Sequence, residues 1–212
     1  MGTPKPPRIG TQEQPLRLAV FISGSGSGME ALLHHQKANE CCHTTSLVLS
    51  NTPNISGLEK ATAHNICTEV VEIDSNIPNP QEQRESHEKN IIDTLQKYNI
   101  EAVILSGYMR ILSPFFVRKW TGRLLNIHPS LLPKYPGAHA HRDALADGAT
   151  VSGCTVHLVD EGVDTGQILA QKKLQIDILE TEETLSERVK KLEHQLYPEV
   201  IDAYAKGELY LG

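Results

Sequence analysis

Short apolar stretches alternate along the chain with longer amphipathic ones. The short stretches have the length and composition of strands and cover residues 17–22, 46–50, 70–73, 102–106, 123–127, 153–159 and 167–175. The longer stretches carry apolar residues at helical spacing and cover residues 29–36, 81–98 and 183–205. Strands that alternate with helices predict an α/β fold with a mostly parallel central sheet and flanking helices. Ligands of such sheets bind beyond the carboxyl ends of the strands.

The same pattern predicts local detail. The run 102–106 is apolar on both faces, which is typical of a central parallel strand. Residues 153–159 and 167–175 flank a turn-rich segment and are expected to pair as a hairpin. Pro198 lies inside the last predicted helix and is expected to kink it. No Gly/Ser-rich linker divides the chain, so one domain is predicted over residues 16–212.

Composition and charge narrow the classes of function. With 20 basic and 26 acidic side chains, the net charge of −6 argues against a general nucleic-acid binder. No apolar run approaches the roughly 18 residues of a membrane span. The four cysteines form no C-x-x-C pair, which disfavours a cysteine-based zinc site. Residues 1–15 are rich in proline and lack the apolar core of a signal peptide, so we expect a disordered leader and a cytoplasmic protein.

A glycine-rich turn follows the first predicted strand. Gly24, Gly26 and Gly28 alternate with serines directly before a predicted helix. Free N–H groups at a helix N-terminus suit a phosphate. The spacing is neither that of a dinucleotide-binding turn nor that of a P-loop, so it favours a monophosphate over NAD or ATP. The alternative is a flexible turn without a ligand.

Asn126 and His128 end another predicted strand. Positions i and i+2 of a strand point to the same side, so both side chains are expected to face one pocket, with Ile127 in the core. An amide beside an imidazole can stabilise an oxyanion and move a proton. Taken alone, the pair is more typical of ordinary hydrogen-bonded residues. The proline-rich loop 129–137 that follows strengthens the functional interpretation.

The segment 160–166 places three carboxylates beside two glycines. A carboxylate next to His128 would raise the pKa of the imidazole. Spacing alone does not choose among Asp160, Glu161 and Asp164, and a solvated acidic turn is the simpler interpretation. His139 and His141 have an H-x-H spacing, but the neighbouring Arg142 in the same expected loop opposes a cation, so no metal site is predicted.

These segments together resemble the phosphoribosylglycinamide formyltransferases, a family of folate-dependent formyltransferases. The resemblance runs from about residue 16 to the C-terminus. It rests on the sequences SGSGSGMEALL, GYMRILSPFFV, GRLLNIHPSLLPKYPGAHAHR, GCTVHLVDEGVDTGQIL and SERVKKLEHQLYP. It implies a single-domain, Rossmann-like formyltransferase fold. The implied reaction moves a formyl group from 10-formyltetrahydrofolate, as co-substrate, to the amine of glycinamide ribonucleotide in purine biosynthesis, without a metal.

The resemblance also assigns roles to residues. The implied catalytic residues are Asn126, His128 and Asp164. The implied ribonucleotide-binding residues are Gly26, Ser27, Gly28, Lys190 and Glu193. The implied folate-binding residues are Arg84, Met109, Arg110, Ile111, Leu112, Asn126, Asp160, Glu161, Gly162, Val163 and Asp164. Gly28 departs from the family, which commonly has Asn there. Glu193 would repel a phosphate and is expected to face the ribose hydroxyls or the amine.

Other functions compete with this one. A second enzyme that uses 10-formyltetrahydrofolate, either a transferase or a hydrolase, is the nearest alternative. The deformylases of the folate usually carry an extra N-terminal domain, and the formyltransferases of methionyl-tRNA an extra C-terminal one, for which this chain has no room. A non-catalytic nucleotide-binding regulator is the alternative outside enzymes. The expected partners are small molecules, with no nucleic acid or membrane, and a homodimer is compatible with the sequence.

Overall fold

A computed structural model describes residues 7–209, which form one seven-stranded sheet in the order β3-β2-β1-β4-β5-β6-β7. The first five strands run parallel, and β6 pairs antiparallel with both β5 and β7. The strands are β1 (Leu16–Ile22), β2 (His43–Ser50), β3 (Cys67–Val70), β4 (Ala102–Leu105), β5 (Leu124–His128), β6 (Val151–Leu158) and β7 (Ile168–Gln175). The helices are α1 (Ser27–Ala38), α2 (Ser56–Ala63), α3 (Pro80–Lys97), α4 (Pro114–Lys119), α5 (Ala140–Ala146) and α6 (Glu182–Ala205).

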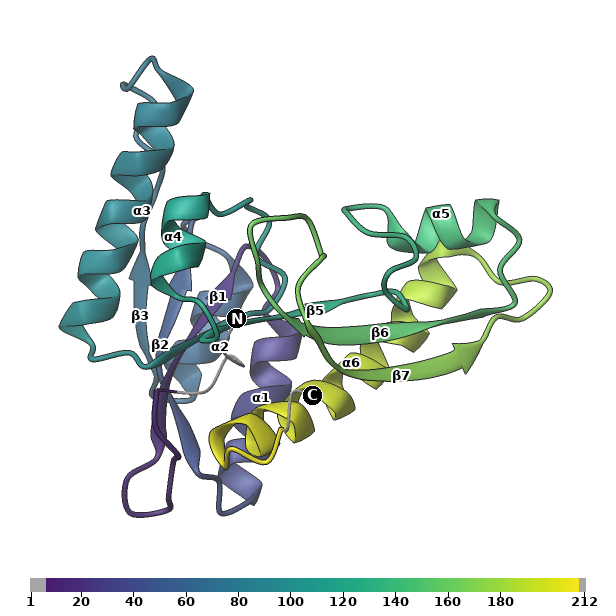
Figure 1. Ribbon diagram of the computed structural model, residues 1–212, viewed down its shortest axis with the longest axis horizontal. Helices are drawn as coiled ribbons and strands as arrows, with labels where there is room; N and C mark the ends of the chain where they lie inside the picture. Colours follow the sequence, from purple (N-terminus) through teal and green to yellow (C-terminus); the bar gives the residue numbers. More distant parts are fainter. Residues whose placement is uncertain (1–6, 210–212) are drawn as a thin grey trace.

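Helices cover both faces of the sheet (Figure 1). Alternate residues of β1 enter different cores: Leu18 and Val20 pack with α1 and α6, whereas Ala19 and Phe21 pack with α3 and α4. This alternation is the two-residue period of a strand that is buried on both sides. The predicted parallel α/β fold and the predicted hairpin of β6 and β7 are thereby confirmed.

The carboxyl ends of the parallel strands β1, β4 and β5 lie on the same side of the sheet. The loop after β6 reaches this side, where Asp164 contacts His128. β4 lies between β1 and β5, so the glycine-rich turn and the Asn126–His128 strand end approach the same region. Gly26 has φ 63°, in the left-handed region that favours glycine, and a Cβ there would lie 2.9 Å from Cα of Gly57. The turn therefore requires glycine at this position.

Several expectations differ from the structure. The third strand begins at Cys67 and ends at Val70, earlier than the predicted run 70–73. Helices α2, α4 and α5 were not expected, and α5 contains His141, which had been expected in a loop. α6 is one helix that includes Pro198, and the kink expected there stays a prediction.

The segment 7–15, which belongs to the leader expected over residues 1–15, contacts the domain. The Arg8 guanidinium forms a forked ion pair with Glu101, and Gly10 N–H donates to the carbonyl of Ala205 at 2.8 Å. These contacts link a stretch that has few apolar residues of its own to the start of β4 and the end of α6. The rest of the expected leader, residues 1–6, lies outside the described residues.

Candidate active site

The end of β5 presents Asn126 and His128 on the same side, as predicted, while Ile127 packs against the core. β6 runs antiparallel to β5 and places His157 directly opposite Asn126. Directly opposed residues of an antiparallel pair have neighbouring side chains on one face of the sheet. The hairpin thus adds a second histidine to the pair that ends β5.

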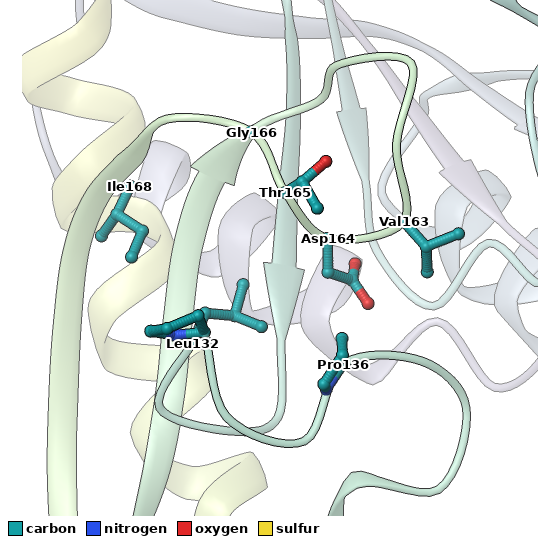
Figure 2. Close-up of a pocket in the computed structure, with 8 residues that line it drawn as sticks. Leu132, Pro136, Val163, Asp164, Thr165, Gly166 and Ile168 are labelled. Atoms are coloured by element: carbon teal, nitrogen blue, oxygen red, sulfur yellow. The ribbon is translucent and has the colours of Figure 1, made fainter.

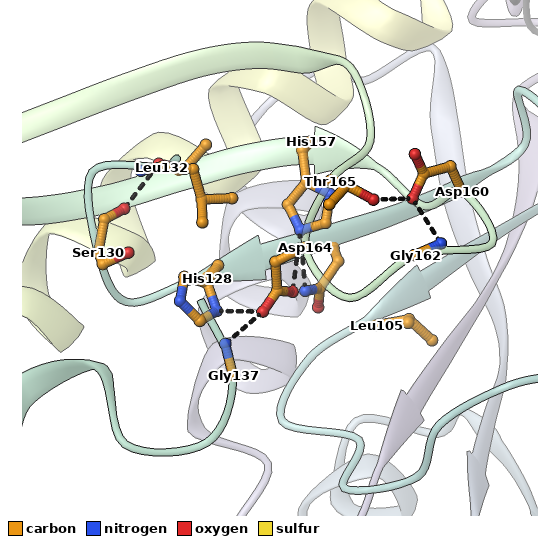
Figure 3. Close-up of polar contacts among 12 residues, drawn as sticks. Leu105, His128, Ser130, Leu132, Gly137, His157, Asp160, Gly162, Asp164 and Thr165 are labelled. Carbon is orange, nitrogen blue, oxygen red and sulfur yellow. Dashed lines mark hydrogen bonds and ion pairs between the residues drawn. The ribbon is translucent and has the colours of Figure 1, made fainter. Parts of the chain in front are cut away.

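The loop after β6 brings Asp164 to this pair of strands (Figure 3). Its Oδ2 atom lies 3.3 Å from Nδ1 of His128 and accepts a hydrogen bond from Gly137 N–H at 2.8 Å. Its Oδ1 atom lies 3.5 Å from Nε2 of His157. Asp164 has φ 53°, a left-handed conformation that aspartate tolerates better than most residues. The turn in the backbone therefore aims the carboxylate at both imidazoles.

Asp160 and Glu161 have other partners. Asp160 Oδ1 accepts from Gly162 N–H and from the Thr165 hydroxyl, which shapes the loop (Figure 3). Glu161 pairs with Arg118 at 2.9 Å on the surface. Of the three carboxylates that the sequence left open, the one that faces His128 is Asp164.

The pKa of Asp164 is lowered to about 2. Burial raises it, but the contact with His157, the Gly137 N–H and the nearby His128 together outweigh burial. Asp164 is therefore a carboxylate at neutral pH. It is a fixed negative charge between two rings.

His128 is buried, and burial lowers its pKa below the usual value. The carbonyl of Tyr135, which accepts from Nε2–H at 2.8 Å, and the charge of Asp164 both raise the pKa but do not outweigh burial. Asp164 thus raises the pKa of His128 as expected of a neighbouring carboxylate, but burial makes the net shift downward. The ring nevertheless faces an acceptor on each nitrogen, and only the imidazolium can donate to both.

Asn126 is oriented by His157. The His157 Nδ1–H donates to the carbonyl of Leu158 at 2.9 Å, and Nε2 lies 3.1 Å from the amide nitrogen of Asn126 and 3.5 Å from Oδ1 of Asp164. With a proton, Nε2 donates to Asp164; without one, it accepts from the Asn126 amide. One amide hydrogen of Asn126 is used in this contact, and the second remains available. The arrangement can hold an amide donor beside an imidazole, which suits a developing oxyanion.

A cavity of about 200 Å³ opens beside Asp164 (Figure 2). It is lined by Leu132, Pro133, Pro136, Val163, Asp164, Thr165, Gly166 and Ile168. Most of these side chains are apolar, so the cavity could hold a flat organic group next to the carboxylate. Val163, which the sequence assigns to the folate, is one of its walls.

The other residues assigned to the folate lie around this edge. Met109 and Ile111 are 77% and 71% exposed on the segment after β4, with Arg110 between them and the half-buried Leu112 beyond. Met109 N–H donates to the Ser23 hydroxyl at 2.8 Å, which ties the segment to the glycine-rich turn. Such exposed apolar side chains are candidates for contact with a ligand.

Arg84 stands apart from this group. It is exposed on α3, and within residues 7–209 no hydrogen bond or ion pair links it to the other assigned residues.

The residues assigned to the ribonucleotide come from α1 and α6. Gly26 precedes α1, Ser27 and Gly28 begin it, and no side chain caps its N-terminus. An uncapped helix end offers free N–H groups to an anion. Lys190 is exposed on α6, and burial raises the pKa of Glu193, one turn further on, to about 7, while Lys190 lowers it only in part.

The candidate metal ligands of the described residues lie outside this region. Two clusters have suitable spacing: Glu30 with His34 and His64, and His35 with Cys41 and Asp202. Glu30 is paired with Lys60, and Asp202 accepts from two histidines. Within residues 7–209, His139 and His141 belong to neither cluster.

Sequence reasoning missed three contributors to the site. They are His157, the N–H of Gly137 and the carbonyl of Tyr135. His157 could have been found by pairing the hairpin with β5, but its register was unknown. The other two are backbone groups, which no residue type reveals.

No helix within residues 7–209 is long and apolar enough to cross a membrane.

The comparisons with known proteins agree on the family of this chain. The family model described as formyl transferase matches residues 16–201. The trifunctional purine biosynthetic protein adenosine-3 of Bos taurus is 41% identical over 95% of this chain, and the chain covers 19% of that protein. The chain spans about a fifth or less of the length of the trifunctional relatives.

Shorter relatives match over most of their length. The phosphoribosylglycinamide formyltransferase of Escherichia coli (strain K12) is 40% identical, with 92% of this chain and 89% of that protein covered. The solved structure of glycinamide ribonucleotide transformylase 1 from Symbiobacterium toebii has a TM-score of 0.85 and 35% identity, and covers 91% of this chain and 89% of its own. The structure of phosphoribosylglycinamide formyltransferase from Brucella melitensis has a TM-score of 0.83 and 41% identity, and covers 93% and 100%. On its sequence and its fold, the chain belongs to the formyl transferase family.

Proposed function

We propose that this chain transfers a formyl group from 10-formyltetrahydrofolate to the primary amine of glycinamide ribonucleotide, a step of purine biosynthesis. One observation carries the proposal. The chain belongs to the formyl transferase family, and three side chains meet at the carboxyl ends of its parallel strands: Asn126, His128 and Asp164. The uncapped N-terminus of α1 lies at the same side of the sheet. An acyl-transfer site and an anion site then lie beside one another.

The reaction begins with the neutral amine, whose lone pair attacks the formyl carbon. The carbonyl π electrons move to oxygen and form a tetrahedral oxyanion. The free amide hydrogen of Asn126 donates to that oxygen, and the positive charge of the His128 imidazolium stabilises its negative charge. The negative charge of the oxyanion favours the imidazolium, which burial alone disfavours.

Collapse of the intermediate breaks the bond from carbon to the folate nitrogen. The attacking amine loses a proton and the leaving nitrogen gains one, so the proton count balances through a relay by one water. Asp164 keeps His128 oriented and offsets its charge. The donor carbonyl is already activated by its leaving nitrogen, so this route needs no metal.

The substrates occupy opposite sides of the catalytic residues in this proposal. The folate lies against residues 109–112 and the loop 160–164, with Val163 at the cavity. The phosphate lies at Gly26, Ser27 and Gly28, and Lys190 adds a positive charge. Glu193 carries less negative charge than an ordinary glutamate at neutral pH, because its pKa is raised, which reduces repulsion. Arg84 is retained as a proposed folate contact.

The proposed partners are these two small molecules, in the cytoplasm. A homodimer is compatible with the proposal, and light scattering measures it directly. The second candidate function is hydrolysis of the same folate. It is favoured by the same oxyanion-stabilising pair, because water can attack the formyl carbon in place of the amine.

A formyl-transfer assay tests the proposal. The purified chain is mixed with 10-formyltetrahydrofolate with and without glycinamide ribonucleotide, and the deformylated folate, the formylated ribonucleotide and formate are measured. The expected result is folate turnover only with the ribonucleotide and equal formylated product. Formate release at the same rate with and without the ribonucleotide would favour hydrolysis of the folate. No turnover with or without the ribonucleotide would contradict both formyl transfer and hydrolysis. The variant Asp93→Asn, an exposed carboxylate on α3, is the matched control for Asp164→Asn.

A further inference from the structure

Gly28 occupies the second position of α1, and it makes room for a side chain from another strand. A Cβ built on Gly28 would lie 2.6 Å from Oγ of Ser106. This is too close for two unbonded atoms, so one of them would have to move. Gly28 has ordinary helical backbone angles, unlike Gly26, so the backbone does not demand glycine here. The missing side chain leaves room for the observed rotamer of Ser106.

Ser106 directly follows β4, the strand between the glycine-rich turn and the end of β5. Its N–H donates to the carbonyl of Phe21 at 2.9 Å, and the next residue, Gly107, accepts from Ser23 N–H at 3.1 Å. The backbone of Ser106 is therefore fixed against the end of β1 and the start of the turn.

The hydroxyl of Ser106 makes no hydrogen bond to any of the residues that the structure describes. Ser106 is only 9% exposed. A hydroxyl in this position can bind a ligand, because Oγ of Ser106 is not among the fully enclosed atoms without a partner. This one lies against the first turn of α1, whose N-terminus has no side-chain cap. The hydroxyl of Ser106 and the N–H groups of the first turn of α1 therefore lie close together.

We propose that Ser106 binds the ribonucleotide, with its hydroxyl donating to a phosphate oxygen held at the N-terminus of α1. This rests on the function proposed above, and it adds a ligand contact from β4. Gly28 and Ser106 act as a pair: the missing side chain on the helix admits the hydroxyl from the strand. A phosphate oxygen then accepts from the hydroxyl and from the N–H groups of Ser27 and Gly28.

The first test is Ser106→Ala, with titration calorimetry of glycinamide ribonucleotide and, separately, of a folate. A hydroxyl that donates to a charged oxygen is worth about tenfold or more in affinity. We expect the ribonucleotide to bind about tenfold more weakly and the folate to bind unchanged. Ser152→Ala is the matched control, because Ser152 is also buried with an unpartnered hydroxyl but lies on β6. Wild-type affinity for the ribonucleotide in Ser106→Ala overturns the inference.

The second test uses Gly28→Ala, whose new methyl group would push the Ser106 hydroxyl into another rotamer. We expect Gly28→Ala, Ser106→Ala and the double variant to lose similar ribonucleotide affinity, because all three remove the same contact. Losses that multiply in the double variant would show that the two residues act independently, and would overturn the pairing.

A third variant, Gly28→Ser with Ser106→Gly, moves the hydroxyl from the strand to the helix. It is expected to bind the ribonucleotide more tightly than Ser106→Ala, and equal or weaker binding would count against the proposed contact. Failure of the underlying function looks different. If the wild-type chain does not bind the ribonucleotide, both proposals fall; if it binds and Ser106→Ala matches it, only the role of Ser106 falls.

Discussion

At the residue scale, Asp164 contacts the two histidines and the Gly137 N–H with one carboxylate. We expect Asp164→Asn to lower kcat for formyl transfer by about 10²- to 10⁴-fold, the usual range for a group that supports general acid–base chemistry. The amide carries no charge to favour the His128 imidazolium, although it can still accept from Gly137. KM for each substrate should change only a few-fold.

Steady-state kinetics with both substrates varied measures this effect. Asp93→Asn should leave kcat and both KM values unchanged, because it removes a carboxylate from the exposed face of α3. Unchanged turnover in Asp164→Asn would remove Asp164 from the mechanism. A large rise in KM without a change in kcat would instead make it a binding residue.

His157 is expected to act as a positioning residue through Asn126. Its Nε2 atom orients the amide at 3.1 Å, so His157→Phe should let the amide rotate and lower kcat about tenfold, less than loss of a whole oxyanion donor would. His157→Gln keeps an acceptor and should recover part of the loss. If Phe and Gln at this position are equally slow, orientation of Asn126 is not the cause. Circular dichroism checks that both variants fold.

At the element scale, α6 is tied to the strands that carry the site. The hydroxyl of Tyr197 is buried and lies 2.9 Å from the carbonyls of both Leu105, at the end of β4, and Leu125, near the start of β5. The hydroxyl of Tyr204, two turns later, donates to the carbonyl of Gly122 at 2.8 Å, away from the site. Both tyrosine hydroxyls bond to backbone carbonyls, but only Tyr197 does so close to the candidate active site.

We expect Tyr197→Phe and Tyr204→Phe each to reduce the free energy of unfolding by about 1–3 kcal/mol, because each leaves a buried carbonyl without its donor. Only Tyr197→Phe should also lower kcat/KM, since it loosens β4 and β5, the strands that carry the site. Urea unfolding and initial rates measure the two effects. Equal loss of activity in both variants would show that general stability, rather than local order, sets the rate.

The elements that were predictable from sequence are those with a strand or helix pattern of their own. β1, β4, α3 and α6 have one, and each was expected within about two residues of its bounds. α2 is short and has only Gly57 and Ala61 as buried residues, so its pattern carries little signal. α5 likewise buries only two alanines. Tertiary contacts, which the local sequence does not contain, stabilise these helices.

The sequence predicts one part of the candidate site, the part that a single strand carries. The two-residue period of β5 alone predicts that Asn126 and His128 face the same side. Asp164 required the family resemblance, because three carboxylates share its loop. The lowered pKa of His128 required burial, which a sequence does not report. Composition predicts a disordered leader over residues 1–15, and it does not reveal the contacts that Arg8 and Gly10 make with partners about 90 and 195 residues away.

At the scale of the whole molecule, Asp202 joins α6 to α1 and β2. Its two oxygens lie 2.7 Å from Nε2 of His35 and 2.7 Å from Nε2 of His43. Burial raises the pKa of Asp202, but the two histidines outweigh it and lower the pKa to about 2. The thiol of Cys41 also faces this carboxylate, and burial, with Asp202 as the next cause, raises the pKa of that thiol to about 12. Asp202 is thus the charged centre of a contact between three elements.

We expect this contact to appear in the acid stability of the whole chain. A carboxyl group whose pKa is lower in the folded than in the unfolded state stabilises the fold above the unfolded pKa of about 4 and loses that contribution as the pH falls toward 2. From the size of the shift, Asp202→Asn should cost on the order of 2 kcal/mol at pH 7. The difference between wild type and variant should shrink steadily between pH 4 and pH 2. Urea unfolding at a series of pH values measures it, with Asp93→Asn as the control. A difference that stays constant over this range would mean that Asp202 acts through packing rather than through its charge.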